Sequence, residues 1–419
     1  MQWSWSRYNI LGGGCLCNLR TGIIVEPEPG EIDFGGSADA VRLELLEELA
    51  GDGFVVEDVG EEKNIALAQI KARARNDKYL IILLAPTMEC NNHCPYCYEP
   101  YGVRCGKPMS GENIDLFCKA LDECLQKNSF EVLSLEFIGG EPMLGWGVIK
   151  KLLPRVKAIC QKYDVKLEIE MTSNGQLLTP AKAEFLSQFN WKHLQVTFEG
   201  PPEVHDRIRL TKTGQPTFAK IMANLTTMIK AGCAPTEITA RVHVDTDNPS
   251  ATKRLLRIFT EQGLSSYGGF RTRLAFVNAS LPNEAEVQPY YAYEKAQILL
   301  QLFRFMKELE INGAPEIYSF GPVCYKRRRW SFIVGPDGSL YDCESLLGQT
   351  EYATGHVRDG LIGKNSDAYF DRLPEKCREC QFLPVCAGAC PYYSQVKPDS
   401  PCPREFLALI QSELLTINN

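Results

Sequence analysis

The sequence predicts an α/β protein built around a partial, open barrel of six β/α units. Strand-like apolar runs alternate with amphipathic helical patterns through the middle of the chain, after a short α+β pattern and before a loop-rich segment. Repeated strand–helix alternation is typical of parallel sheets, and six units are too few to close an eight-stranded barrel. We therefore expect a TIM-like barrel that is open on one side, with its functional site at the carboxyl ends of the strands.

The six expected strands are short apolar runs at 79–85, 133–138, 166–172, 194–198, 238–244 and 271–277. Helical periodicity predicts helices at 112–127, 145–162, 216–231 and 250–262, and a further one at about 287–311. The barrel is expected to span residues 78–285, with a bridging helical region at 286–319 and a loop-rich domain at 320–419.

Residues 1–77 are expected to form a small α+β, winged-helix-like module. Two strand-like runs, SRYNIL and GIIVEP, are separated by three consecutive glycines, and two helical patterns follow them. Cys15 and Cys17 fall on one face of a strand by alternation, so we expect both thiols to be buried.

Composition narrows the class of protein. A net charge of −7 gives no global attraction to nucleic acid or acidic membranes. There is no secretory signal and no apolar run of the ~20 residues that a membrane span needs, so we expect a cytoplasmic protein. The basic run 326–329 is interpreted as a solvated loop or strand edge in preference to a contact for an acidic partner.

The chain has 17 cysteines. A reducing compartment favours metal or catalytic thiols over disulfides. Isolated cysteines in helical patterns are expected to be small buried hydrophobic residues, namely Cys118, Cys124, Cys160 and Cys233. The other clusters, near residue 90 and after residue 323, indicate metal chemistry.

Residues 90–97, CNNHCPYC, come directly after the first barrel strand and carry Cys90, Cys94 and Cys97. A structural zinc site takes four ligands, whereas a [4Fe–4S] cluster held by three cysteines leaves one iron open to an outside ligand. The three cysteines alone leave both possibilities open, since a fourth ligand can come from a distant residue.

The spacing CxxxCxΦC, in which Tyr96 is the aromatic residue, resembles the cluster motif of the radical S-adenosylmethionine (SAM) enzymes. Three further segments at strand ends match that family in order: GGEP at 139–142, TSNG at 172–175, and the region from Glu199 to Arg209. The family usually has Asp where Glu199 stands. The resemblance implies a SAM site formed by Tyr96, Gly139, Gly140, Glu141, Pro142, Ser173, Asn174 and Arg209.

In this interpretation Glu141 accepts a hydrogen bond from the SAM ammonium, and Ser173 and Asn174 face the ribose or the methionine moiety. The planar fork of Arg209 suits the SAM carboxylate.

The seven C-terminal cysteines resemble the SPASM extension of radical SAM enzymes that modify peptides and proteins. The resemblance implies two auxiliary [4Fe–4S] clusters, and three in total with the barrel cluster. One auxiliary cluster is expected on Cys377, Cys380, Cys386 and Cys402. The other is expected on Cys324, Cys343 and Cys390, with its fourth ligand undecided between another residue and a substrate thiolate. Two zinc ions on the same cysteines are the alternative.

Two further expectations follow from resemblance. Glu344 stands where anaerobic sulfatase-maturating enzymes have an acidic base, so it is a candidate acid/base, and the alternative is a hydrogen-bond partner in the cluster loop. The N-terminal module resembles the recognition element of enzymes that modify ribosomally made peptides (RiPPs), which binds the leader of the precursor as an added strand. A plain docking domain is the alternative.

These resemblances imply a maturase that cleaves SAM to a 5′-deoxyadenosyl radical and abstracts hydrogen from a precursor peptide. The expected product is a crosslink, with a Cys-derived thioether first. The expected partners are the precursor peptide and a reductase such as flavodoxin or ferredoxin, with no nucleic acid and no membrane. The alternatives are a sulfatase-type maturase that oxidises Cys or Ser to formylglycine, and a non-catalytic zinc-bound scaffold or RNA-binding protein.

Overall fold

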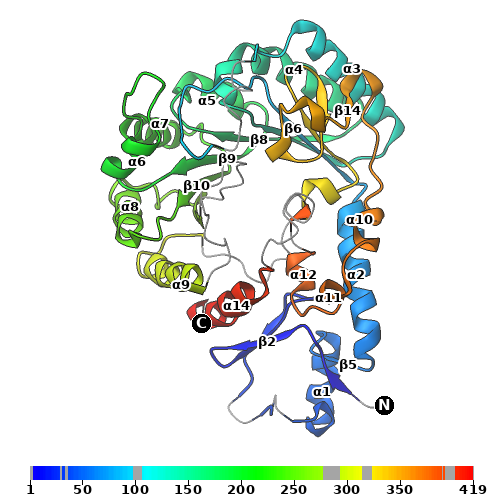
Figure 1. The fold of residues 1–419 in the computed structure, drawn as a ribbon. Helices are drawn as coiled ribbons and strands as arrows, with labels where there is room; N and C mark the ends of the chain where they lie inside the picture. Colours follow the sequence, from blue (N-terminus) through cyan, green and yellow to red (C-terminus); the bar gives the residue numbers. More distant parts are fainter. Residues whose placement is uncertain are drawn as a thin grey trace.

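The computed structural model describes residues 3–28, 31–33, 36–97, 106–276, 293–313, 323–388, 390–391 and 402–418. Its main feature is a curved nine-stranded sheet with the strand order β11-β10-β9-β8-β7-β6-β12-β13-β14 (Figure 1). The six predicted strands are all present and parallel: β6 (Tyr79–Leu84), β7 (Val132–Phe137), β8 (Lys166–Ser173), β9 (Trp191–Phe198), β10 (Glu237–His243) and β11 (Phe270–Ala275). The prediction of an α/β fold with a parallel barrel sheet is confirmed.

Strands β7 to β11 each have a mainly apolar face and a mainly polar face, whereas β6 is apolar on both faces. In β10, Ile238, Ala240 and Val242 are fully buried, and they belong to the large core that the strands form with the covering helices. Because successive side chains of a strand point to opposite faces, the alternate residues of β10, such as Arg241, face the barrel interior. A closed TIM barrel fills its interior with branched apolar side chains. The polar interior found here is suited to a ligand.

The helices between the strands cover the outer face of the sheet (Figure 1). They are α3 (Gly111–Lys127), α4 (Trp146–Lys162), α5 (Pro180–Ser187), α6 (Pro202–Ile208), α7 (Phe218–Lys230) and α8 (Pro249–Glu261), followed by α9 (Tyr293–Glu308). Ser110 caps α3 by accepting a hydrogen bond from the Asn113 N–H at 3.1 Å. The four predicted inter-strand helices are confirmed to within two residues, whereas the start predicted at 287 lies outside the described residues.

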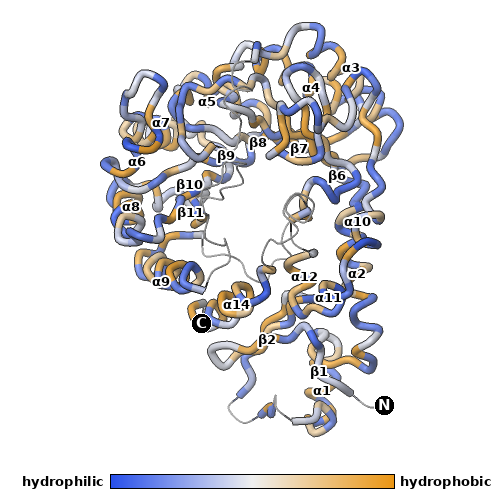
Figure 2. The backbone as a smooth tube through the Cα atoms, viewed as in Figure 1, coloured by the Kyte–Doolittle hydropathy of each residue, from blue (hydrophilic) through white to orange (hydrophobic). Residues whose placement is uncertain are grey.

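Hydropathy follows this layering. Figure 2 shows apolar segments concentrated where the barrel strands meet α3, α4 and α5. The four isolated cysteines are all buried in this core, as predicted: Cys118, Cys124, Cys160 and Cys233.

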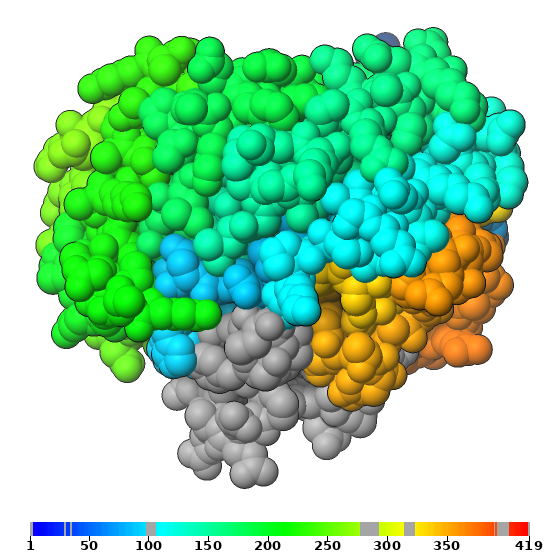
Figure 3. Space-filling model, turned by 90° about the horizontal axis from the view of Figure 1, so that it is seen from above, coloured from blue at the N-terminus to red at the C-terminus, as the bar shows by residue number. Residues whose placement is uncertain are grey.

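The C-terminal block adds three strands to the barrel sheet, which the sequence did not predict. β12 (Ser331–Val334) pairs in parallel with β6, and β13 (Ser339–Tyr341) and β14 (Gly355–His356) continue antiparallel. All four residues of β12 are buried, so this strand covers what would otherwise be the open edge of β6. Figure 3 shows the block, in yellow and orange, against the cyan residues of α3, where Asn113 donates to the Pro336 carbonyl at 3.1 Å.

The N-terminal module contains a three-stranded antiparallel sheet, β2 (Asn9–Gly12), β3 (Cys15–Asn18) and β4 (Ile24–Val25), and a two-stranded pair, β1 (Ser4–Trp5) with β5 (Val55–Val56). Its helices are α1 (Leu43–Gly51) and α2 (Val59–Arg75). Gly13 and Gly14 have φ of +57° and +84° and form the β2–β3 turn, a conformation that favours glycine. Cys15 and Cys17 are buried as predicted, and burial raises the pKa of Cys17 to about 12.

The module packs against the C-terminal block through α2 and β2. The C-terminal helices are α10 (Asp367–Asp371), α11 (Glu375–Arg378), α12 (Leu383–Cys386) and α14 (Arg404–Asn418). Buried Ile70 and Ala74 of α2 contact a cluster that includes Leu383 of α12. Ser412 of α14 donates to the Leu11 carbonyl at 2.7 Å, so α14 covers the β2 edge of the small sheet.

No described helix is long and apolar enough to cross a bilayer.

Candidate functional site

The cysteine loop lies at the carboxyl ends of the barrel strands, where the GGEP turn packs directly on its backbone. Gly139 has φ of +118°, and a Cβ there would lie 2.5 Å from the Thr87 carbonyl oxygen. A Cβ on Gly140 would lie 2.3 Å from the Glu89 carbonyl oxygen. The Glu141 N–H donates to that same oxygen at 2.7 Å. Only glycine permits this approach, so the glycine pair positions the segment that leads into Cys90.

Cys90, Cys94 and Cys97 lie in one loop between β6 and α3, with Cys94 buried and the other two half-buried. The Cys97 N–H donates to the Cys94 carbonyl at 3.3 Å, which turns the end of the loop. Within the ranges described above, no three His, Cys, Asp or Glu side chains converge on a single metal ion. Cysteines on separate irons of a [4Fe–4S] cluster stand wider apart than the ligands of one zinc ion.

Glu141 holds the end of β8 against the GGEP turn. Its Oε1 accepts hydrogen bonds from Ser173 Oγ at 2.8 Å and from the Met143 N–H at 3.0 Å, and its Oε2 accepts from the Asn174 N–H at 2.7 Å. The side chain is fully buried, and burial raises its pKa while these hydrogen bonds oppose the rise. Pro142 follows as the first residue of a short 3-10 helix. The predicted contact of Glu141 with the SAM ammonium stays a prediction.

Three amide side chains that the sequence did not single out connect the cysteine loop to the end of β8. Asn174 Nδ2 donates to Asn91 Oδ1 at 2.7 Å, and Asn91 Nδ2 donates to Gln176 Oε1 at 3.1 Å. Gln176 Nε2 donates to Asn92 Oδ1 at 2.5 Å. The two asparagines lie inside the CNNHC motif, which is the signal that could have pointed to them. This amide ladder joins two of the segments that the resemblance assigned to SAM.

A second network joins Tyr96, Glu199, Arg209 and His243. The Tyr96 hydroxyl donates to Glu199 Oε1 and accepts from Arg209 Nη1 at 2.7 Å. His243 Nδ1, at the end of β10, lies 3.1 Å from Glu199 Oε1. Burial alone would raise the pKa of Glu199, but His243 and Arg209 outweigh it and lower the pKa to about 2. The site therefore holds a permanent carboxylate beside the cysteine loop.

Two buried donors in this region indicate a ligand. Arg209 Nε and Asn92 Nδ2 have no hydrogen-bond partner among the residues that the structure describes. Buried donors are normally paired, because an unpaired one costs about 1–3 kcal/mol. An acceptor-rich molecule bound beside the cysteine loop would satisfy both. These residues fit a SAM molecule, whose carboxylate and ribose supply the acceptors.

The C-terminal cysteines fall into two neighbourhoods. Burial raises the pKa of Cys324, and the charge of Cys390 raises it further. Burial also raises the pKa of Cys343, to which the charges of Glu344 and then Cys324 add. Burial also raises the pKa of Cys377, followed by the charges of Cys402 and Cys380. The interacting thiols belong to the same predicted group in each case. The assignment of Cys386, at the end of α12, and of the clusters themselves stays a prediction.

The basic run 326–329 is not a solvated edge throughout, and the prediction is wrong for Arg327. Its side chain is 5% exposed, with Nη1 donating to the Ala387 carbonyl and Nη2 to the Gly388 carbonyl at 3.0 Å. Burial lowers the pKa of its guanidinium, and the charges of nearby cysteines, Cys324 and Cys386 among them, oppose this shift. A buried charge needs such partners, so this cation lies between the two cysteine neighbourhoods.

Glu344 begins the 3-10 helix Glu344–Leu346 and lies close enough to Glu136, on the interior face of β7, for the two charges to interact. The residue is accessible to solvent, but many protein atoms lie around its carboxyl group. The reduced hydration raises the pKa of this carboxyl group, while the charges of Arg241 and Arg273 lower it. Glu136 of β7 faces the interior, and Thr172 Oγ1 donates to it at 2.9 Å.

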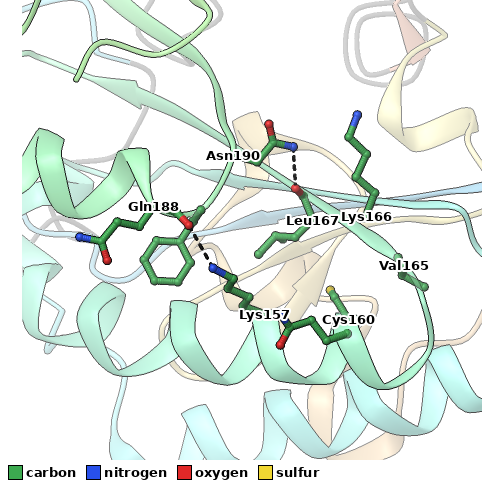
Figure 4. Close-up of a pocket in the computed structure, with 9 residues that line it drawn as sticks. Lys157, Cys160, Val165, Lys166, Leu167, Gln188 and Asn190 are labelled. Carbon is green, nitrogen blue, oxygen red and sulfur yellow. Dashed lines mark hydrogen bonds between the residues drawn. The ribbon is translucent and has the colours of Figure 1, made fainter. Parts of the chain in front are cut away.

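A surface pocket lies at the opposite end of the barrel, at the start of β8. It is lined by residues that include Lys157, Leu167 and Asn190, and Lys157 Nζ donates to the Gln188 carbonyl at 3.1 Å (Figure 4). Active sites of such barrels lie at the carboxyl ends of the strands, so this pocket is separate from the site.

Comparison with known proteins decides the family. The family model "Radical SAM superfamily" matches residues 84–258. A PqqA peptide cyclase from Bradyrhizobium diazoefficiens is 32% identical over 334 residues, covering 74% of this chain and 81% of the relative. The chain belongs to the radical SAM superfamily. It resembles a serine-type anaerobic sulfatase-maturating enzyme from Bacteroides thetaiotaomicron at 23% identity, over 75% of this chain and 83% of that enzyme.

The radical SAM fold also matches a solved structure over nearly the whole chain. SuiB from Streptococcus suis, bound to the precursor peptide SuiA, has a TM-score of 0.55 and 13% identity, covering 96% of this chain and 98% of SuiB. The prediction of a radical SAM enzyme is therefore confirmed, with SAM and a [4Fe–4S] cluster as its cofactors. The number of clusters stays a prediction.

Proposed function

We propose that this radical SAM enzyme modifies a ribosomally made precursor peptide and installs a crosslink, specifically a thioether from a peptide cysteine. The observation that carries the proposal is the convergence of the cysteine loop, the GGEP turn and Arg209 on a polar barrel interior that also contains Glu344. The similarity to a PqqA peptide cyclase and to SuiB, which binds a precursor peptide, supports a peptide substrate.

In this proposal Cys90, Cys94 and Cys97 hold the barrel cluster, and SAM completes its coordination. The bound pair supplies one-electron cleavage of SAM to methionine and a 5′-deoxyadenosyl radical. Arg209 orients the SAM carboxylate, with its guanidinium fixed by Tyr96 and Glu199. Glu141 keeps Ser173 and Asn174 in position.

Thioether formation breaks one S–H bond and one C–H bond of the peptide and forms one S–C bond. The hydrogen atom of the C–H bond would go to the 5′-deoxyadenosyl radical, which becomes 5′-deoxyadenosine. The thiol proton would go to a base, for which we propose Glu344, and an auxiliary cluster on the C-terminal cysteines would take up the remaining electron. A cluster held only by Cys324, Cys343 and Cys390 would leave one position open, which we propose for the peptide thiolate.

The leader of the precursor is proposed to bind at the β4 edge of the N-terminal sheet. The β2 edge is covered by α14, whereas Ile24 of β4 is 41% exposed. The Asn18 N–H donates to the Ile23 carbonyl, so alternation directs the backbone groups of Ile24 away from β3. An added strand would pair with these groups.

SAM cleavage is the first test. Anaerobically reconstituted protein with dithionite and SAM is expected to form 5′-deoxyadenosine, and Cys97→Ala is expected to form none. Iron and sulfide analysis of both proteins shows whether a cluster is present. Cleavage that persists in Cys97→Ala would refute the proposed cluster.

The product is tested by mass spectrometry of cysteine-containing candidate peptides after turnover, with free thiols alkylated. A thioether lowers the peptide mass by two hydrogen atoms and protects one cysteine from alkylation. Ile24→Pro, which removes one outward N–H of β4, is expected to weaken binding of a leader-bearing peptide at least tenfold without changing SAM cleavage. Equal binding would remove the β4 edge from the proposal.

Formylglycine formation is the second candidate, because a sulfatase-maturating enzyme is among the relatives. The same experiment separates the two. Formylglycine carries an aldehyde that reacts with hydrazides, whether it comes from a serine or from a cysteine. Oxidation of a cysteine also removes its sulfur from the peptide. A product with such an aldehyde would favour this candidate over the crosslink.

A further inference from the structure

Two arginines stand side by side on the interior face of the barrel. Arg241 of β10 and Arg273 of β11 are register partners in the parallel pair. Each lies two residues before the end of its strand, at His243 and Ala275, and therefore in the carboxyl half of the barrel. Both alternate with residues of the outer apolar face, so their side chains extend into the same interior as Glu344.

This pairing is unfavourable for the fold alone. Like charges directly opposite each other on neighbouring strands destabilise a sheet, and strand positions favour β-branched and aromatic residues. Residues that violate the usual sequence preferences of a strand occur at functional sites more often than elsewhere. Two adjacent guanidinium groups together form a strong site for an oxyanion, because each offers a fork of N–H donors.

The surroundings indicate what that oxyanion is. Arg241 and Arg273 share the interior of the barrel with carboxyl groups on strands β7 and β8. These are Glu136 of β7 and Glu170 of β8, which belong to another part of the wall because β9 separates β8 from β10. A singly charged carboxylate fits such a bipolar interior better than a phosphate, which adds up to two charges.

The arginine pair is also connected to the SAM site. Arg241 Nε lies 3.3 Å from His243 Nε2, and His243 Nδ1 lies 3.1 Å from Glu199 Oε1. If His243 Nδ1 donates to Glu199, its Nε2 is left to accept from Arg241. A group held by Arg241 is therefore separated from the Glu199–Tyr96 network by only one side chain.

We propose that Arg241 and Arg273 bind a carboxylate of the peptide substrate, from an Asp or Glu side chain or from a free C-terminus, beside the residue that is oxidised. The proposal deepens the proposed function and rests on it. It assigns the class of substrate side chain that the barrel selects, in addition to the leader that the N-terminal module selects.

The test measures peptide affinity rather than product. Anaerobically reconstituted full-length enzyme with bound SAM is titrated in a calorimeter with three millimolar probes. These are acetyl-Gly-Glu-Gly-amide, its Gln counterpart, and acetyl-Gly-Gly-Gly with a free carboxyl terminus. We expect the Glu probe or the free-terminus probe to bind at least tenfold more tightly than the Gln probe, a difference of about 1.4 kcal/mol. The probe that binds identifies the source of the carboxylate.

Arg241→Gln and Arg273→Gln are each expected to reduce this preference to less than twofold, and Arg241→Lys to reduce it partly. Arg271→Gln is the matched control, because Arg271 lies on the same strand but donates to the Gly268 and Phe270 carbonyls. It is expected to keep the full preference. Melting temperatures show that each variant is folded.

The proposal is overturned if all three probes bind equally to the wild-type enzyme. It is also overturned if the Gln variants lose affinity for SAM and for the probes alike, since the pair then belongs to the SAM site. A wild-type enzyme that forms no 5′-deoxyadenosine would instead refute the proposed function, so the two failures are distinguishable.

Discussion

At the scale of single residues, the side chain of Glu199 connects two parts of the site. It follows β9 directly, yet its carboxylate reaches both Tyr96 in the cysteine loop and His243 at the end of β10. An aspartate, which the family resemblance implies at this position, is one methylene group shorter. The residue that departs from the expected pattern is therefore the one that joins the cysteine loop to the end of β10.

The raised pKa of Glu136 leads to a prediction of how the stability of the fold depends on pH. Burial and then the charge of Glu344 raise its pKa from 4.5 to about 7. Because the pKa of Glu136 is higher in the folded state than in the unfolded state, ionising Glu136 destabilises the fold. This loss of stability is absent below about pH 4.5 and reaches its full size above about pH 7. We expect Glu136→Gln to raise the free energy of unfolding by about 1–2 kcal/mol at pH 8 and by less at pH 6, measured by denaturant titration at both pH values.

Glu170→Gln is the contrasting variant on the neighbouring strand. A hydrogen bond with His193 lowers the pKa of Glu170, so its ionised form stabilises the fold. Its replacement is expected to lower stability at both pH values, because both lie above the ordinary pKa of a glutamate. An equal gain for Glu136→Gln at pH 6 and pH 8 would contradict the explanation given for that residue.

At the scale of elements, the turn after β7 determines where the cysteine loop lies. A Cβ on Gly140 would approach the Met88 and Glu89 carbonyl oxygens within 2.4 Å. We expect Gly140→Ala to displace the loop, to reduce bound iron and visible absorption by more than half, and to slow SAM cleavage at least tenfold. Gly147→Ala in α4 is the control, because a Cβ added there would meet nothing within 4 Å. Normal iron content in Gly140→Ala would show that the loop adapts.

Helix α2 is the element that joins the N-terminal module to the C-terminal block. Ile70 is 1% exposed and packs on the C-terminal cluster, whereas Ile65 on the same helix is 43% exposed. Ile70→Ala is expected to cost about 2–4 kcal/mol of unfolding free energy, and Ile65→Ala less than about 1 kcal/mol. Denaturant unfolding of the two variants checks this, and equal losses would mean that the packing face of α2 is misplaced.

At the scale of the whole molecule, the N-terminal module and the C-terminal block form one packed unit. Lys71 of α2 pairs with Asp371 at 2.6 Å, and Ala66 packs in a cluster with Phe382 and Leu415. Deleting residues 1–77 would therefore expose the interior of the C-terminal block. A point change at the β4 edge tests leader binding without this damage.

This coupling predicts how cluster loss spreads through the molecule. Cys377→Ser is expected to speed hydrogen exchange in α12 and α2 at least tenfold, because the loops that pack on α2 lose a ligand of the proposed auxiliary cluster. Exchange in β7 and β8 is expected to stay unchanged. Hydrogen–deuterium exchange read by mass spectrometry measures both regions, and acceleration confined to the cysteine loops would contradict the coupling.

The sequence alone determined the parts of this protein that depend on local order. Strand and helix periods lie within short windows, so the six parallel strands and four of their covering helices were predicted to within a few residues. The CxxxCxΦC motif and the segments at successive strand ends determined the superfamily, because parallel strands bring their carboxyl ends together whatever the loop lengths are.

Tertiary structure alone decided the contacts between distant segments. The extension of the barrel by β12, the burial of Arg327 and the facing of Arg241 and Arg273 toward Glu344 join residues that are far apart in the chain. No periodic pattern encodes such pairs, because a charged run looks the same whether solvent or thiolates surround it. Burial and the choice of partner are properties of the packed molecule, and they decide which of the many polar residues belong to the site.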